Sequence, residues 1–189
     1  MGRWQPGSRE RLEAAALALF SERGYDSTTV AEIAARAGLN ERTFYRYFTD
    51  KREVLFDGGH FLEGFLTRSV AESPASAGPL DAIIAALEQA ATEVFADRLA
   101  IARQRQTVID ANPELQERER SKMASIATAL ARTLRERGVG DPAASLAAET
   151  GLTVFRISFA LWVAHENTRS LTELIKETMT DLRTITAGP

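Results

Sequence analysis

The stretch from Asn40 to Phe48 gathers side chains that could bind phosphate groups and base edges. Phe44 and Phe48 stand four residues apart, so on a helix that starts at Glu41 they would face a core and leave the other positions exposed. An Arg guanidinium can donate paired hydrogen bonds to phosphate or to a guanine edge, and Tyr and Thr hydroxyls can bind phosphate oxygens. The candidates for this chemistry are Arg42, Thr43, Tyr45, Arg46 and Tyr47.

No pattern in the chain indicates catalysis or metal binding. The sequence has no Cys, and its two His residues, His60 and His165, are far apart and lack supporting ligand residues. A nucleophile with a base and an orienting partner is not visible either. We therefore expect neither an enzyme nor a cofactor, and a helical enzyme is the least favoured alternative.

Three short helices would position the candidate residues. The first is expected over residues 8–24, and the second follows Thr29, which stands at capping-box spacing from Glu32. The turn over residues 38–40 ends in an Asn that can cap the third helix. In such an arrangement the last helix can enter a major groove, which is about 12 Å wide. The sequence therefore predicts a helix-turn-helix domain over residues 1–56.

Composition and charge favour a cytoplasmic protein with an N-terminal polyanion partner. The 189-residue chain is 44% hydrophobic and carries a net charge of -3, yet residues 1–52 hold nine Lys or Arg against seven Asp or Glu. That segment is therefore +2 and the remainder is -5, the asymmetry expected of a DNA-binding protein. No apolar run approaches the roughly 20 residues that span a bilayer, and residues 1–7 contain no apolar signal stretch. We expect a cytoplasmic location and no membrane partner.

The N-terminal segment holds a specific series of residues: Gly24-Tyr25-Asp26-Ser27-Thr28-Thr29-Val30, Ile33-Ala34, Ala37-Gly38-Leu39, Thr43-Phe44-Tyr45-Arg46-Tyr47-Phe48, Lys51 and Leu55. With this series the sequence resembles the DNA-binding domain of TetR-family regulators over about residues 9–56. One departure is the start of the third helix at Asn40-Glu41-Arg42, where many relatives carry Ser, a basic residue and Gly.

The resemblance implies a role for each matching position. It implies that the sugar-phosphate backbone is bound by Thr29, Tyr45, Tyr47 and Lys51. It also implies that base edges are contacted by Arg42, Thr43 and Arg46. Arg3 and Trp4 precede the first helix, where some relatives place an arm on DNA; a terminus without fixed structure is the alternative and the favoured one.

Residues 57–189 are expected to form a second helical domain, so that the whole chain is all-α with about nine helices. A linker at residues 73–79 precedes most of it. This half resembles the TetR-family regulatory domain, and in particular the subgroup that includes the mycofactocin regulator, which implies ligand binding, with acyl-coenzyme A as the ligand class, and dimerisation. The helix from Lys51 to Ser73 would transmit a ligand signal, with Gly58-Gly59 as a hinge or a harmless kink.

The segment Gly151 to Ala164 is apolar around its whole circumference apart from Arg156. Such a helix must be covered on more than one side. A second copy that packs on residues 142–186 would cover it, with Leu161 and Ile175 as positions that could meet the partner, and the alternative is the central helix of a monomeric bundle. A two-fold homodimer would present two reading helices to a palindromic operator.

Arg105 and Arg156 are two charges on otherwise apolar helix faces. A buried charge without a partner is costly, so either a nearby carboxylate, Asp110 or Glu149, pairs with each one, or an anionic ligand does. We favour the internal pairs. An elongated apolar ligand with an anionic end would be enclosed by Phe65, Leu87, Arg105, Phe155, Arg156, Phe159 and Trp162, although aromatic residues at helical spacing are more often plain core.

Together these patterns predict a DNA-binding transcription regulator, a repressor that a small apolar or acyl-type ligand releases from double-stranded operator DNA. A ligand-independent architectural DNA-binding protein is the principal alternative. Such a protein would need little beyond a basic surface, whereas well over half of this chain is acidic and rich in apolar residues.

Overall fold

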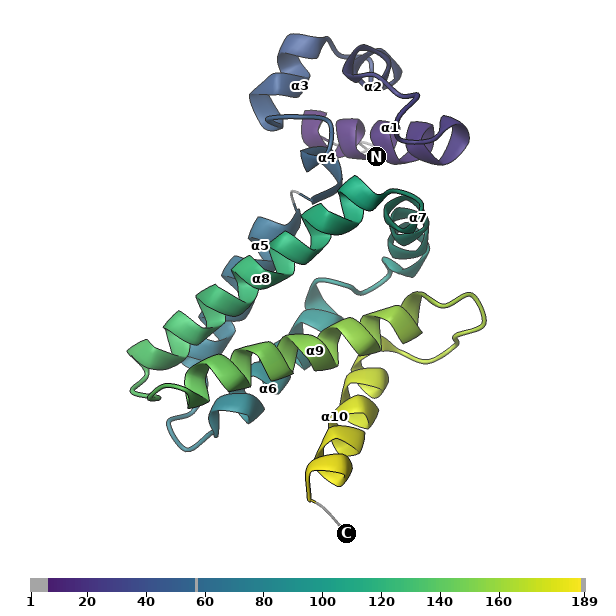
Figure 1. Cartoon of the computed structure of the whole chain (residues 1–189). Helices are drawn as coiled ribbons and strands as arrows, with labels where there is room; N and C mark the ends of the chain where they lie inside the picture. Colours follow the sequence, from purple (N-terminus) through teal and green to yellow (C-terminus); the bar gives the residue numbers. More distant parts are fainter. Residues whose placement is uncertain (1–6, 57, 188–189) are drawn as a thin grey trace, which may run out of the picture. The chain divides into compact units, whose positions relative to one another are not determined.

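The computed structural model describes residues 7–56 and 58–187, and within these ranges the chain is helical and contains no strand. The all-α expectation is confirmed. The helix expected from residue 51 to residue 73 corresponds to two labelled helices, α4 and α5. The helices are α1 (Ser8–Arg23), α2 (Val30–Arg36), α3 (Glu41–Tyr47), α4 (Glu53–Phe56), α5 (Gly58–Glu72), α6 (Pro79–Glu93), α7 (Leu99–Asp110), α8 (Pro113–Glu136), α9 (Ala143–Val163) and α10 (Leu171–Ala187), as labelled in Figure 1.

Local sequence signals set most of the helix ends. α8 begins at Pro113, where the missing N–H of Pro costs no helical hydrogen bond. α10 begins after a capping box, in which the Ser170 hydroxyl accepts from the Glu173 backbone N–H at 3.2 Å and the Glu173 carboxylate accepts from the Ser170 N–H at 2.8 Å. The expected linker at residues 73–79 lies between α5 and α6. Arg3 and Trp4 lie outside the described residues.

The chain forms two compact units that do not follow its sequence order completely. The N-terminal unit comprises Met1–Gly58 together with Gln104–Glu119, and the C-terminal unit comprises Gly59–Arg103 together with Arg120–Pro189. The last part of α7 and the first part of α8 therefore pack with helices that precede them by about fifty residues or more. A functional division into domains 1–56 and 57–189 stays a prediction.

The core of the N-terminal unit holds α1 to α4 around a few fully buried side chains. Leu12 of α1, Ile33 of α2 and Phe44 of α3 have no exposed surface. Residues of the 104–119 segment join the same core, with Ile109 and Leu115 also fully buried. The segment therefore completes the hydrophobic core of this unit.

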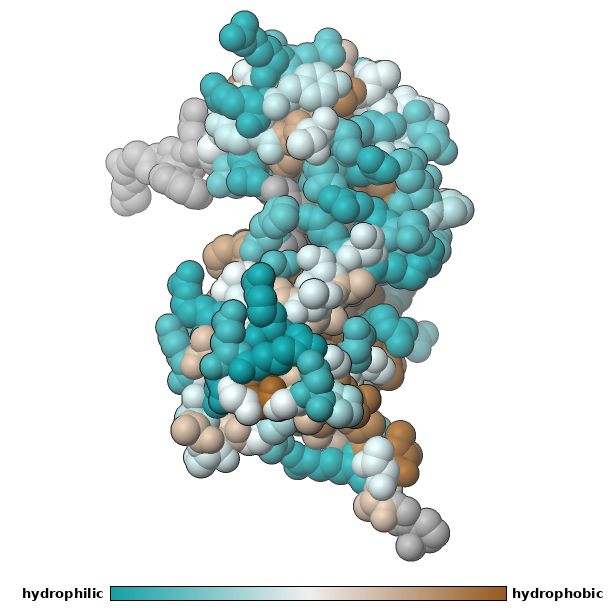
Figure 2. All heavy atoms as spheres, turned by 60° about the vertical axis from the view of Figure 1, so that its left-hand side comes forward, coloured by the Kyte–Doolittle hydropathy of each residue, from teal (hydrophilic) through white to brown (hydrophobic). Residues whose placement is uncertain are grey.

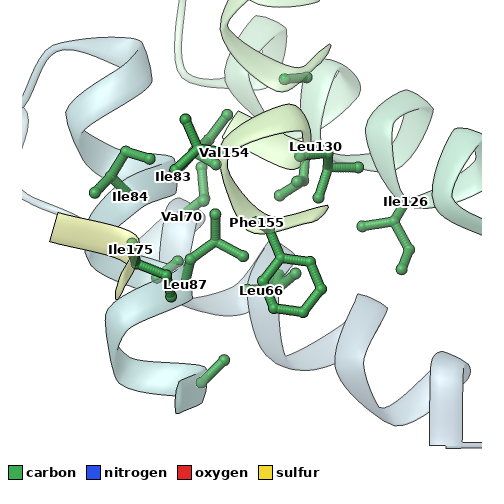
Figure 3. Close-up of a cluster of buried hydrophobic side chains, with 14 of the residues drawn as sticks. Leu66, Val70, Ile83, Ile84, Leu87, Ile126, Leu130, Val154, Phe155 and Ile175 are labelled. Carbon is green, nitrogen blue, oxygen red and sulfur yellow. The ribbon is translucent and has the colours of Figure 1, made fainter. Parts of the chain in front are cut away.

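The core of the C-terminal unit is formed by α5, α6, α8, α9 and α10. Figure 3 shows the labelled side chains pointing toward one another from these helices. Ile83 and Leu87 of α6 have no exposed surface, and α6 packs along both α9 and α10. Ile175 of α10 belongs to this core and is fully buried, so the expectation that it could meet a partner chain is wrong. It is already covered by its own chain.

Among the residues that the structure describes, α9 is covered on one side only. Its buried side packs against α6 and α10, and Gly151 lies so close to Ile83 of α6 that a Cβ atom at residue 151 would be 2.5 Å from the Ile83 Cγ2 atom. On the other side Leu146, Ile157 and Leu161 are 62%, 42% and 44% exposed. Figure 2 shows hydrophobic (brown) patches that interrupt the hydrophilic (teal) surface. By length and composition α9 is also the one helix in the described ranges that could cross a membrane, but its buried side is part of the core described above.

The contact between α6 and α9 leads to a prediction about two glycines. Gly151→Ala should lower the free energy of unfolding by about 1–3 kcal/mol, because the added methyl group has no space beside Ile83. Gly64→Ala is the matched control on α5: beyond the neighbouring residues and the local helix backbone, no atom lies within 4 Å of the position of its Cβ, so the substitution should raise stability by about 0.4–1 kcal/mol. Urea unfolding followed by circular dichroism measures both, and equal stabilities would contradict the close packing.

Candidate functional site

The turn between α2 and α3 is fixed by a helix cap at Asn40, by Gly38 and by a hydrogen bond from the half-buried Arg11. The Asn40 side-chain oxygen accepts hydrogen bonds from the Thr43 backbone N–H at 2.9 Å and the Thr43 hydroxyl at 3.0 Å, which begins α3 at Glu41. Gly38 has a φ of +67°, a conformation that favours glycine. The Arg11 guanidinium of α1 donates to the carbonyl of Ala37. These three interactions together set the direction in which α3 begins.

The exposed face of α3 carries three of the predicted residues. Phe44 points into the core with no exposed surface, and Phe48 follows it at 2% exposure. Arg42, Tyr45 and Arg46 are exposed, and Tyr45 has 56% of its surface exposed. Thr43 and Tyr47 are half-buried and flank this face, and Glu41, which sequence reasoning did not assign to it, is exposed as well. The face thus presents guanidinium, phenol and carboxylate groups.

The two arginines of this face differ in their contacts. The Arg46 guanidinium lies over the Tyr47 ring, 4.8 Å from its centroid, and its Nη2 atom donates to the Tyr47 hydroxyl at 3.0 Å. Arg42 makes no hydrogen bond or ion pair with any residue that the structure describes. Its donors are therefore available to a ligand.

Thr29 acts as a helix cap. Its hydroxyl accepts from the Glu32 backbone N–H at 3.2 Å and donates to the Glu32 carboxylate at 2.9 Å, and its backbone N–H donates to the same carboxylate at 2.8 Å. These donors hold the pKa of the Glu32 carboxyl below its ordinary value. The Thr29 hydroxyl is thus engaged at the start of α2, and a phosphate there would compete with Glu32.

Lys51 holds the loop between α1 and α2. Its Nζ atom donates to the backbone carbonyls of Tyr25 at 2.7 Å and Thr28 at 2.9 Å, and it lies 4.1 Å from the centroid of the Tyr25 ring. An ammonium group has three donors, so one remains for a phosphate. The loop position of Thr29 therefore depends on Lys51.

A group of ion pairs ties residues 104–119 to α4. Arg52 bonds to Asp50 at 2.9 Å and to Glu114 at 3.0 Å, and Arg118 bonds to Glu53 at 2.6 Å. The Arg52 guanidinium holds the pKa of the Asp50 carboxyl below its ordinary value. These bonds join segments that hydrophobic contacts already bring together, so they orient α4 against the start of α8.

Arg105 belongs to the same unit and has an internal partner. Its Nη1 atom bonds to Glu119 at 3.0 Å, its Nε atom donates to the Leu55 carbonyl at 2.8 Å, and its guanidinium lies 4.9 Å from the centroid of the Phe56 ring. The favoured expectation of an internal ion pair is confirmed. The predicted partner, Asp110, is wrong, because Arg105 pairs with Glu119. The 14 residues that separate Arg105 from Glu119 include the end of α7, so no helix periodicity relates the two residues.

The expected ion pair between Arg156 and Glu149 is wrong. Arg156 is exposed on α9 and forms no ion pair with any residue that the structure describes, so a ligand contact of Arg156 stays a prediction. The reason is that α9 is covered on one side only, which leaves Arg156 on its open side with Ile157 and Leu161. An exposed guanidinium needs no partner in the core.

The aromatic residues predicted to line a pocket pack against one another. The ring centroids of Phe155 and Phe159 are 5.6 Å apart, and those of Phe159 and Trp162 are 5.5 Å apart. Phe95, which follows α6 and was missed in the sequence, lies 5.7–6.0 Å from all three rings. We name Phe95, Phe155, Phe159 and Trp162 the aromatic cluster. It belongs to the hydrophobic core of the C-terminal unit.

Leu87 and Phe65 lie in the same hydrophobic core as the aromatic cluster, Leu87 fully buried and Phe65 half-buried. A hollow of about 300 Å³ in the C-terminal unit is lined by other residues, among them Ser69, Glu72 and Gln89. The predicted lining residues of the C-terminal unit other than Arg156 therefore belong to one hydrophobic core, and none of them lines that hollow. Among the described residues no cluster of three or more His, Asp or Glu side chains could hold a metal ion.

Comparison with known proteins matches both parts of the chain. The family model for bacterial regulatory proteins of the tetR family matches residues 12–57, and the model for the MftR C-terminal domain matches residues 77–187. The HTH-type transcriptional regulator TcmR of Streptomyces glaucescens is 34% identical over 76 residues, which cover 40% of this chain and 34% of that protein. The chain thus aligns with about a third of the length of this relative.

Solved structures with the same fold cover nearly the whole chain. A TetR-family transcriptional regulator from Syntrophomonas wolfei is 21% identical, with a TM-score of 0.68 over 96% of this chain and 95% of the other. Thermus thermophilus FadR, a TetR-family repressor solved in complex with lauroyl-CoA, is 25% identical, with a TM-score of 0.52 over 92% of each chain. Since the match to the MftR C-terminal domain alone spans more than half of the sequence and the tetR-family match covers the helix-turn-helix, the chain belongs to the TetR family of bacterial regulatory proteins.

Proposed function

We propose that this protein is a transcription regulator that binds a palindromic operator as a homodimer in the cytoplasm and releases it when an apolar or acyl-type ligand binds. Regulators of this family bind DNA and respond to ligands. The observation that supports the proposal most directly is the exposed face of α3, where Arg42, Tyr45 and Arg46 are displayed on a helix whose start is fixed by Asn40.

The chemistry of this face suits the major groove. Arg42 and Arg46 stand one helical turn apart and can donate paired hydrogen bonds to the N7 and O6 atoms of guanine. Tyr45 and Tyr47 supply hydroxyls for phosphates beside the groove, and the free donor of Lys51 can bind a further phosphate. The Thr43 hydroxyl would donate to a base edge only after it leaves Asn40. Thr29 would contact the backbone only after its hydroxyl leaves Glu32.

Replacing Arg42 should weaken operator binding and relax base preference. Arg42→Ala removes a guanidinium that has no partner within the described chain, so the fold should be unaffected while one paired base contact is lost. The expected cost is about 1–3 kcal/mol at a single base position. Arg132→Ala, an exposed site on α8, is the control for net charge. Fluorescence anisotropy with duplexes selected from a random pool measures both, and parent-like binding by Arg42→Ala would contradict the assignment.

The open side of α9 is the proposed dimer surface. Leu146, Ile157 and Leu161 recur at three-turn and one-turn spacing and therefore lie along one face of the helix. An exposed apolar patch of this kind marks an interaction surface. A second copy would cover the same face of its partner, as two-fold symmetry requires.

A charge on this face should prevent dimerisation without unfolding the chain. Leu161→Glu places a carboxylate at a position that is 44% exposed in the single chain, so the monomer can solvate it but a dimer cannot. Ile101→Glu is the matched control, because Ile101 is an equally apolar side chain, 59% exposed, on α7. Light scattering should show a dimer for the parent and for Ile101→Glu, and a folded monomer for Leu161→Glu. A parent protein that is monomeric at micromolar concentration would refute the proposed dimer surface.

The ligand is proposed to enter the aromatic cluster. The cluster is apolar, and Phe159 is only partly buried, so its rings could separate around an acyl chain. The similarity to FadR, which binds lauroyl-CoA, supports this ligand class. A ligand changes DNA affinity only if it binds two conformations unequally. The packing of the rings against one another, with centroids 5.5–6.0 Å apart, is an observation in favour of a ligand-independent role.

Acyl-coenzyme A should lower operator affinity and change Trp162 fluorescence. In a Trp4→Phe variant Trp162 is the only tryptophan, so its emission reports on the aromatic cluster directly. We expect lauroyl-CoA to lower operator affinity by about 5- to 150-fold, as for a coupling of about 1–3 kcal/mol. Coenzyme A without an acyl chain is the control. If neither fluorescence nor operator affinity responds to any acyl chain length, the ligand class is wrong.

A further inference from the structure

Glu41, the first residue of α3, carries a carboxylate without a partner among the described residues. It is exposed and forms no hydrogen bond or ion pair there. Several other acidic residues of the N-terminal unit are paired: Glu22 bonds to Arg36 at 2.7 Å, and Asp50 bonds to Arg52 at 2.9 Å. Glu41 therefore places a negative charge on the exposed face of α3 that is proposed to meet DNA. No described residue compensates this charge.

The position of Glu41 on α3 decides what it can reach. In helix-turn-helix proteins the N-terminal residues of the reading helix contact base edges. Asn40 fixes the start of α3, so Glu41 and Arg42 are the first two residues of that helix. Glu41 also stands one turn before Tyr45, which is exposed on the same face. The carboxylate is thus held at the end of the helix that reads the bases.

The chemistry of a carboxylate restricts its partners in the major groove. An ionised carboxylate accepts hydrogen bonds and donates none. Phosphates repel it, and guanine and thymine present acceptor atoms to the groove, at N7 and O6 and at O4. Cytosine presents the N4 amino group as a donor, without the neighbouring N7 acceptor that adenine adds beside its amino group. Cytosine is therefore the base that Glu41 can bind with the least repulsion.

We propose, on the basis of the DNA-binding function proposed above, that Glu41 is a specificity-determining residue that accepts a hydrogen bond from the N4 amino group of one cytosine in each operator half-site. The carboxylate contributes by selection among bases, since it lowers affinity for every sequence that lacks a donor at that position. Arg42, its neighbour, reads a guanine or a phosphate nearby and keeps the site attractive for DNA.

The experiment is a selection from a random duplex pool with the parent protein and two variants. The parent should select a palindrome with one cytosine in each half-site that loses about 5- to 150-fold in affinity on substitution. Glu41→Ala should lose this preference and keep the remainder of the motif. Glu41→Gln should shift the preference to adenine, because an amide matches the N6 donor and N7 acceptor of that base. Asp26→Ala, which removes an exposed carboxylate outside α3, is the control and should leave the motif unchanged.

The outcomes separate this inference from the proposed function. A parent protein that selects no motif would refute sequence-specific DNA binding itself. A clear parental motif that Glu41→Ala selects unchanged would overturn the role of Glu41 and leave the proposed function standing. A Glu41→Ala variant that loses thermal stability and binds all sequences more weakly, with the same base preferences, would also overturn it, because the residue would then act only on the positive N-terminal end of α3.

Discussion

A helix of seven residues is not stable by itself in water, so α3 depends on the burial of its one apolar side. Phe44 has no exposed surface, and Phe48 fixes the chain where the helix ends. The rings pack 5.2 Å apart, which holds α3 against the core through a single strip of its surface. The side chains of α3 on the opposite side of the helix must therefore face solvent. The exposure of Arg42 and Tyr45, and with it the whole candidate DNA interface, follows from the two buried rings.

Some arginines of the N-terminal unit differ from Arg42 in having partners within the unit. Arg52, Arg105 and Arg118 bond to carboxylates and backbone carbonyls that join α4 to the 104–119 segment. Their charges are compensated within the unit, and they orient its parts. Arg42 has no such partner among the described residues, so its donors are available for the proposed contact with DNA. Each arginine of the first set has at least one partner more than ten residues away in the sequence, whereas Arg42 stands on the exposed face of a single short helix.

In the C-terminal unit α9 contributes both to the hydrophobic core and to an exposed apolar surface. α9 packs Gly151 against α6 on one side and leaves Leu161 open on the other. Small residues allow the close approach to α6, while larger apolar residues on the other side form the proposed dimer surface. The aromatic cluster lies within the hydrophobic core of this unit, so a ligand that separates its rings would act on the helices from which they come. α7 and α8 each contribute residues to both units, so each of these helices continues from one unit into the other.

The sequence by itself determined the helices, their caps and the reading face of α3, because these features depend on residues within one or two turns of each other. The capping boxes at Thr29 and Ser170 and the Phe44–Phe48 spacing are local patterns of this kind. Only the tertiary structure decided that Arg105 pairs with Glu119, that Arg156 is exposed, and that residues 104–119 complete the N-terminal core. These outcomes depend on which helix faces meet, and an apolar face carries no information about its partner, since the hydrophobic effect that buries it has no direction.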